Sequence, residues 1–267
     1  MTTLATTVTD STTMLRRELR HQLRYPSVTL MLIGMPVVFL LLFVFLLGGT
    51  LGAGLGDAVA GTAGGRRAYL EYVTPGILLV AVAAVAQGTS ISVAMDMTEG
   101  IVARFRTMSI ARAAVLTGHV LGALIQTVLC VLIVLVVAMA IGFRPDATPV
   151  EWVAALGVLV LIAIALTWVT VALGMISRTV EGASNLPMPL LLLPFLSSGF
   201  VPTESMPSGV QWVAEHQPFT PFIETLRGLL LGDAIGSSAV ATVIWCTVLT
   251  LGGYLVARSA YDRHSVR

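Results

Sequence analysis

The sequence predicts an all-α, polytopic membrane protein with six transmembrane helices, and two observations carry that prediction. Of the 267 residues, 56% are hydrophobic and only 11% are charged, whereas a soluble domain is typically about 45–50% apolar and about 25% charged. The apolar residues also gather into six long runs, and a helix of about 20 apolar residues crosses a hydrocarbon core of about 30 Å. We therefore expect a helical bundle that spans a bilayer several times.

The chain begins with a threonine-rich segment, and we expect residues 1–13 to be disordered, before a single membrane domain at 14–267. From Met14 to Arg24, leucines recur on one helical face and arginines surround it. This pattern is typical of a helix that lies in the membrane interface with its arginines towards the headgroups. A positively charged flank of the first span is the alternative for this segment.

The expected spans cover about residues 28–47, 75–95, 113–143, 152–176, 183–201 and 239–257. The Pro75-Gly76 pair opens the second run, and three prolines interrupt the fifth. Broken backbone at membrane depth is tolerated only where it is buried in protein or lines a cavity. Residues 202–233 are polar, aromatic and rich in proline, which predicts short re-entrant helices that dip into the outer leaflet and return.

The most charged stretch separates the second and third runs. Residues 96–112 hold three arginines and two carboxylates, and each charge at the centre of a spanning helix costs about 2.5–3.5 kcal/mol. We therefore expect the whole stretch, Asp96 included, to lie at the membrane surface. We interpret it as the place where a component outside the membrane acts on the membrane-spanning part of the protein. Residues 177–182 form a second, shorter charged turn.

The arginines also predict the orientation. All fifteen positive residues are arginine, and eleven of them lie on the side that carries the termini and the two charged turns. By the positive-inside rule that side is cytoplasmic, so we expect a multi-pass cell-membrane protein with both termini in the cytoplasm. The eleven are Arg16, Arg17, Arg20, Arg24, Arg104, Arg106, Arg112, Arg178, Arg258, Arg263 and Arg267.

Several function classes are disfavoured by what the sequence lacks. A P-loop needs the lysine of G-x-x-x-x-G-K-S/T, and the chain has no lysine, so an ATP site must lie on another chain. The two cysteines lie in apolar runs and are expected to be buried thiols, so we expect no metal or cofactor here. Net charge +1 says nothing about nucleic acid, and no basic block suggests a nucleic-acid partner, so we expect none. An ion-coupled secondary transporter stays as an alternative, although such transporters usually carry ionisable residues mid-membrane and none is expected here.

Motifs spread over nearly the whole chain resemble a known family. They are Pro75-Gly76, Glu99-Gly100, Arg104-Phe105-Arg106-Thr107-Met108, Ser198-Gly199-Phe200-Val201-Pro202, Met206-Pro207, Gln217-Pro218, Thr220-Pro221 and Leu226-Arg227-Gly228. In their order and spacing the chain resembles the membrane permeases of type-2 ABC exporters, and most closely the daunorubicin-resistance permease group. Ser109 departs from the pattern, because these permeases usually have proline after the methionine.

The resemblance implies six spans, an interfacial N-terminal helix and re-entrant helices between spans five and six. It also implies a coupling helix in the 96–112 loop that docks on a separate ATP-binding subunit, which would hold ATP and Mg. Two permease copies, identical or paralogous, would export a hydrophobic or amphipathic drug, antibiotic or lipid-like molecule. Export of a polysaccharide or lipid-linked glycan is the alternative, although the aromatic ladder expected for sugars is not evident among four Trp and five Tyr.

Three sets of candidate site residues follow. The docking set in the coupling helix is Glu99, Gly100, Arg104, Phe105, Arg106 and Met108, and a second cytoplasmic contact is Arg178 with Glu181. Polar residues within the spans could line a substrate path, although such residues more often bond to neighbouring helices, each bond contributing about 0.6 kcal/mol. This third set is Gln87, Ser90, Gln126, Thr167, Thr170 and Ser197.

Overall fold

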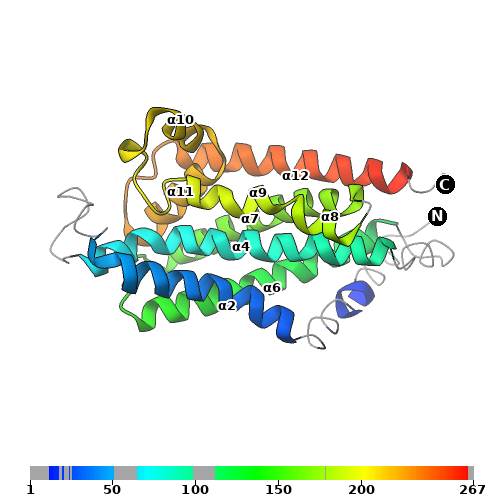
Figure 1. Ribbon diagram of the computed structural model, residues 1–267, viewed down its shortest axis with the longest axis horizontal. Coiled ribbons are helices and arrows are strands. Elements are labelled where there is room, and N and C mark those ends of the chain that lie inside the picture. The colour runs from blue at the N-terminus through cyan, green and yellow to red at the C-terminus, as the bar shows by residue number, and fades with distance from the viewer. Residues whose placement is uncertain are drawn as a thin grey trace.

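The computed structural model describes residues 12–17, 20, 24, 26–50, 65–98, 112–177 and 179–263, and within them every regular element is helical (Figure 1). The all-α prediction is therefore confirmed. Residues 12–17 are helical, and they are called here the 12–17 helix. The other elements are α2 (Pro26–Leu42), η1 (Phe43–Leu47), α4 (Arg66–Thr98), α6 (Arg112–Ala140), α7 (Pro149–Ile176), α8 (Val180–Asn185), α9 (Met188–Leu192), η2 (Leu193–Leu196), η3 (Thr203–Ser205), α10 (Ser208–His216), α11 (Phe219–Leu231) and α12 (Ser238–Arg263).

Five helices in the described part of the chain are long and apolar enough to cross a membrane, at Thr29–Thr50, Arg66–Thr98, Thr117–Ala140, Pro149–Ile176 and Ser238–Ala260. The fifth expected run is instead a shorter apolar segment, Val180–Leu196, that is divided into α8, α9 and η2. Prolines account for the division: Pro187 and Pro189 lie at the start of α9, and Pro194 lies in η2. Proline lacks the N–H that helix continuation needs.

The long helices lie side by side along one axis (Figure 1). One end, called here the Asp96 end, is where α2 begins, α4 and α7 end, and α12 ends. The opposite end carries α10 and α11 and is called the α11 end. The elements α8, α9 and η2 follow one another from the Asp96 end towards the α11 end (Figure 1).

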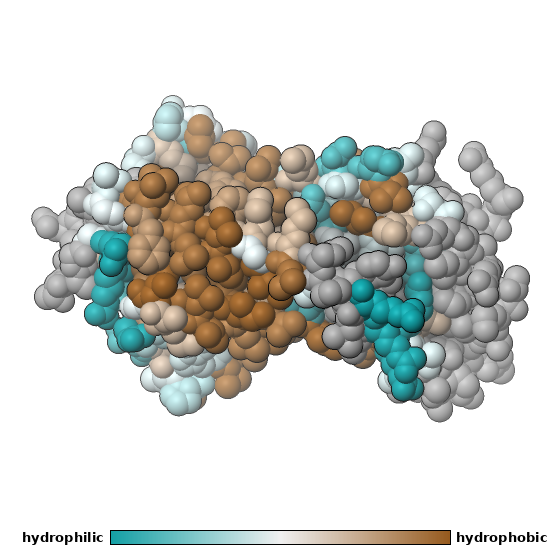
Figure 2. All heavy atoms as spheres, turned by 60° about the horizontal axis from the view of Figure 1, so that its bottom comes forward, coloured by the Kyte–Doolittle hydropathy of each residue, from teal (hydrophilic) through white to brown (hydrophobic). Residues whose placement is uncertain are grey.

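The centre of the bundle is α4, which packs against α2, α6, α7, α8 and α11. In its most apolar stretch 78% of the residues are buried, against 17% for both α2 and α12. The outer helices therefore turn apolar side chains outwards, and Figure 2 shows a broad apolar face on the side where α2 and α6 lie. Such a face suits lipid or a neighbouring helix in a membrane.

The expected start of the second span is wrong, because α4 begins at Arg66 and Pro75 lies inside it. Local and tertiary contacts extend the helix. Arg67 pairs with Glu71 one turn later at 3.1 Å, and Tyr69 and Tyr72 are buried against residues 198–200. These interactions stabilise the first turns of α4, which are too polar to be predicted from the sequence as part of an apolar run.

The turn between α6 and α7 has well-defined ends. Gly142 adopts φ +114°, a conformation that favours glycine, and the N–H of Phe143 donates to Ala138 O at 2.9 Å. That bond is the signature of a Schellman C-cap, so α6 ends at Ala140 rather than at the expected 143. The side chains of Thr148 and Glu151 then form a capping box, which starts α7 at Pro149 rather than at 152.

Candidate functional site

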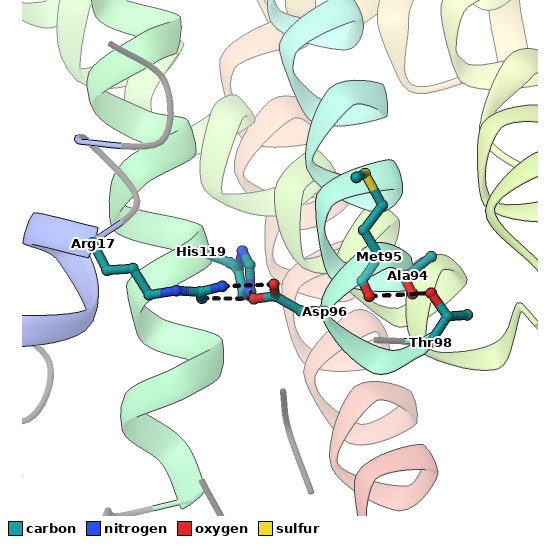
Figure 3. Close-up of polar contacts among 6 residues, drawn as sticks. All are labelled: Arg17, Ala94, Met95, Asp96, Thr98 and His119. Atoms are coloured by element: carbon teal, nitrogen blue, oxygen red, sulfur yellow. Dashed lines mark hydrogen bonds and ion pairs between the residues drawn. The ribbon is translucent and has the colours of Figure 1, made fainter. Parts of the chain in front are cut away.

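Asp96 lies in the last turn of α4 and is buried, with 7% of its surface exposed. The expectation that the surface loop begins at Asp96 is therefore wrong: the helix continues to Thr98, whose hydroxyl donates to Ala94 O at 3.0 Å and Met95 O at 3.1 Å (Figure 3). A carboxylate taken out of water must be paired, because an isolated buried charge is very costly.

The side chains of Arg17 and His119 contact the Asp96 carboxylate. Arg17 donates Nη1–H to Oδ2 and Nη2–H to Oδ1, both at 2.7 Å, and His119 Nε2 lies 3.2 Å from Oδ2 (Figure 3). The two short parallel bonds form a bidentate pair, the strongest arginine–carboxylate geometry. The three residues, called here the Asp96 cluster, come from three elements that are distant in sequence.

Local packing explains why these elements meet. Met14 of the 12–17 helix rests on Gly118 of α6 so closely that a Cβ on Gly118 would lie 2.6 Å from the Met14 Cβ. The next residue of α6, His119, is thereby placed beside Arg17 and Asp96. Gly118 therefore makes a close contact with the 12–17 helix.

The Asp96 cluster ties the 12–17 helix to both helices that flank the charged loop. Asp96 stands near the end of α4, and His119 stands in the first turns of α6. The cluster therefore connects α4, α6 and the 12–17 helix to one another. Sequence reasoning missed this arrangement: Arg17 was expected to face headgroups, whereas it pairs with Asp96, and its neighbour Arg16 is exposed.

The docking residues expected from the sequence are only partly placed. Glu99, Gly100, Arg104, Phe105, Arg106, Met108 and Arg178 lie outside the described residues. Glu181 is exposed in the first turn of α8, at the Asp96 end. Thr179 is the N-cap of that helix, and its Oγ1 accepts the N–H of Gly182 at 3.0 Å. A carboxylate in a first turn is favoured by the helix dipole.

The polar residues expected on a substrate path lie between helices of this chain. Gln87 donates to Ser184 O at 2.9 Å and so joins α4 to α8. Ser90 is buried where its carbonyl meets Gly174 of α7. Gln126 is buried on α6, Thr170 donates to Thr167 O at 3.0 Å, and Ser197 accepts the N–H of Gly199 at 3.2 Å.

A cavity of about 230 Å³ lies between α4, α6, α7 and α11, and its lining is entirely apolar, including Leu78, Leu135, Trp152 and Leu230. None of the six polar residues lines it. In the described ranges, no group of three or more His, Cys, Asp or Glu side chains could hold a metal ion. The two cysteines are buried, free and on different helices, α6 and α12.

Long apolar helices around a buried central span, with a charged cluster at one end, define an integral membrane component. Residues 9–231 match the model of the ABC-2 type transporter family, and the chain belongs to that family. It is therefore a non-catalytic transmembrane permease, and in such transporters the ATP-binding role lies on a separate subunit. The resemblance to type-2 ABC permeases is thus confirmed.

Two curated relatives carry related names. The chain is 29% identical over 231 residues to the daunorubicin resistance ABC transporter permease protein DrrB1 of Streptomyces coeruleorubidus, which covers 86% of this chain and 78% of that one. It is also 29% identical over 174 residues to the probable doxorubicin resistance ABC transporter permease protein DrrC of Mycobacterium tuberculosis, with 62% of each chain covered.

Proposed function

We propose that the chain is the permease subunit of an ATP-driven exporter that moves a hydrophobic or amphipathic small molecule out of the cell. The observation that carries this proposal is the similarity, over 86% of the chain, to a permease named for daunorubicin resistance. The energy source is an ATP-binding subunit with its own ATP and Mg, and a second permease copy or paralogue completes the transporter.

The proposed topology has six crossings in one domain, with the broken segment Val180–Leu196 as the fifth. Two observations support it: α2 begins and α12 ends at the same end of the bundle (Figure 1), and eleven of fifteen arginines belong to the side of the termini. The Asp96 end is then cytoplasmic, the 12–17 helix lies in the inner interface, and α10 and α11 lie on the outer side.

The ATP-binding subunit is proposed to dock on the charged loop between α4 and α6. Interfaces concentrate their energy in a few aromatic and arginine residues, so Phe105 and Arg104 form the proposed docking core, assisted by Glu99, Arg106 and Met108. Arg178 and Glu181 form the second contact. The Asp96 cluster supports this role, because it joins the helices on both sides of the loop and so passes movement of the loop into the bundle.

The test uses cells that express the tagged chain with its ATP-binding subunit, and doxorubicin as the probe. We expect lowered doxorubicin accumulation with the native chain. Two variants are compared: Phe105→Ala, and Glu99→Ala combined with Arg104→Ala. Both should reach the membrane in normal amounts but should no longer co-purify with the ATP-binding subunit, and their efflux rate should fall at least tenfold. Arg67→Ala is the matched control, because Arg67 pairs with Glu71 in an exposed turn at the opposite end.

Each result has a distinct meaning. Unchanged doxorubicin accumulation with an assembled, ATP-hydrolysing complex would refute drug export while leaving the family intact. Full co-purification and efflux in both docking variants would refute the docking core. Loss of the protein from the membrane in these variants, but not in Arg67→Ala, would show that the loop serves topology instead.

A further inference from the structure

Three motifs from distant parts of the sequence meet at the α11 end of the bundle. Gly76 of α4 faces Gly199, which follows η2, so closely that a Cβ on Gly76 would lie 3.0 Å from Gly199 O. A Cβ on Gly199 would in turn lie 3.2 Å from Gly76 Cα and 2.8 Å from Ile223 Cδ1 of α11. Two backbones therefore touch here without side chains between them, and α11 covers the contact.

Because the backbone is not helical at this contact, several of its carbonyl groups have no intrahelical hydrogen bond. Residues 197–201 are not helical, and a buried backbone group without a hydrogen-bond partner is costly. Side chains of α4 and α11 supply the missing donors. Tyr72 Oη–H and Arg227 Nη2–H both donate to Ser198 O at 2.8 Å, and Tyr69 Oη–H donates to Phe200 O at 3.4 Å.

Arg227 joins all three elements. Besides its bond to Ser198 O, its Nη2 donates to Tyr72 O at 3.2 Å, and its guanidinium carbon lies 4.0 Å from the centre of the Tyr72 ring. A cation over an aromatic face at this distance is attracted by the ring. Within the described ranges no carboxylate lies at ion-pair distance from Arg227, so backbone carbonyls and a tyrosine ring are what hold it.

The contact is incompletely satisfied. Arg227 Nε and Ser198 Oγ are both buried, and neither has a hydrogen-bond partner in the described part of the chain. A buried donor or acceptor without a partner carries its full desolvation penalty. Access of water to these two atoms would remove that penalty, so separating the contact costs less than breaking a fully satisfied one.

We propose that Arg227 is a positioning residue that latches the broken fifth segment and α11 onto α4, and that the transport cycle opens this latch at the α11 end. The proposal rests on the proposed function only for its link to transport. Closed, the latch seals the bundle by direct backbone contact between Gly76 and Gly199. Open, it separates α11 and residues 197–201 from α4 and exposes the carbonyls to water.

Arginine is required for this arrangement by its shape. Its planar guanidinium can stack on Tyr72 while one nitrogen donates to two carbonyls, whereas lysine is a flexible point charge that cannot reproduce that geometry. Arg227→Lys therefore keeps the charge and removes the latch. Tyr72→Phe is the milder variant, because it removes one donor to Ser198 O and keeps the ring.

The test measures the labelling rate of a single reporter, Ser198→Cys, by a water-soluble maleimide. The purified full chain is held in lipid nanodiscs, so that the reagent reaches both faces and membrane orientation does not matter. The native Cys130 and Cys246 are fully buried, which keeps background labelling low. Arg67→Lys, at the same end and in an exposed ion pair, is the matched control.

We expect Arg227→Lys to raise the labelling rate at least tenfold, Tyr72→Phe to raise it by a smaller factor, and Arg67→Lys to leave it unchanged. In the assembled transporter, ATP hydrolysis should raise the rate with native Arg227, while Arg227→Lys should hydrolyse ATP and lose efflux of doxorubicin. Unchanged labelling in both latch variants, or an equal rise in Arg67→Lys, would overturn the latch. Absent doxorubicin efflux in the native protein would refute the substrate class but not the labelling result.

Discussion

At the scale of single residues, the Asp96 cluster shows how a charge is kept inside an apolar bundle. The carboxylate is 10% exposed and the Arg17 side chain 37% exposed, so the pair is only partly withdrawn from water. Removing one partner of such a pair leaves the other charge uncompensated, which is more destabilising than removing both. The pair therefore orients the 12–17 helix, and its presence need not raise stability over an apolar substitute.

A double-mutant cycle on Arg17→Gln and Asp96→Asn tests this coupling. We expect a coupling free energy in the upper part of the roughly 0.5–3 kcal/mol range that contacting residues show, because the pair is bidentate and part-buried. The measurement is denaturant unfolding of the purified chain in detergent. The same cycle on the exposed pair Arg67 and Glu71 is the control, with about 0.2–0.5 kcal/mol expected for a pair one turn apart on a helix. Equal coupling in both cycles would contradict the cluster.

The Asp96 cluster also shows where sequence reasoning stops. The charge pattern singled out residues 96–112, but Asp96 was assigned to water because a lone charge is not tolerated in hydrocarbon. Its partner Arg17 is 79 positions away, and no local pattern pairs them. The sequence holds one signal for the cluster, which is the position of complementary charges. An aspartate lies at the end of one apolar run, a histidine near the start of the next, and arginines before the first.

At the scale of elements, hydrophobic length predicted α2, α6, α7 and α12 well, because each is a single apolar run with turn signals around it. The start of α4 escaped prediction, since Arg66, Arg67 and Glu71 make its first turns polar. Its tyrosines are buried only because residues 198–200 happen to pack there. Tertiary contacts, rather than the composition of the segment, decide that boundary.

Neighbouring glycines on α12 provide a direct test of helix packing. A Cβ on Gly253 would lie 2.7 Å from the backbone of Trp168 and Val169 on α7, whereas a Cβ on Gly252 would meet nothing within 4 Å. We therefore expect Gly253→Ala to force α12 away from α7 and to lower the melting temperature and folded yield. Gly252→Ala should be neutral or stabilising, by up to about 1 kcal/mol from helix propensity alone.

The readout is thermal unfolding of both variants in the same detergent. The ring contact between Trp168 and Tyr254, with centroids 5.1 Å apart, adds a tryptophan fluorescence change that only Gly253→Ala should produce. Equal melting temperatures for the two variants would mean that α7 and α12 do not approach as closely as the structure indicates.

At the scale of the whole molecule, burial is distributed from the centre outwards. Helix α4 is almost enclosed, while α2, η1 and α12 leave apolar side chains such as Met31, Leu46, Val240 and Leu255 exposed. In water such surfaces would cause aggregation, but in a bilayer they contact lipid or a second helix bundle. On the face that Figure 2 shows, hydrophilic residues lie on either side of the broad apolar patch.

Cysteine labelling can determine which end of the bundle faces the cytoplasm. With the Asp96 end inside, a cysteine placed at Ser208, exposed at the start of α10, should react with a membrane-impermeant maleimide in intact cells. A cysteine at Ser259, exposed near the end of α12, should react only after the membrane is opened. The arginine distribution is the physical reason, because the membrane potential and insertion machinery retain positive loops in the cytoplasm.

The two positions serve as mutual controls, because they lie at opposite ends of the same bundle (Figure 1). Reaction of both in intact cells would mean that the chain is not properly inserted, and the reversed pattern would place α10 and α11 in the cytoplasm. The reversed pattern would also put the loop between α4 and α6 outside the cell, where no ATP-binding subunit could reach it. The proposed docking of the ATP-binding subunit, and with it the energy source, therefore requires the proposed orientation. This labelling experiment tests that orientation directly.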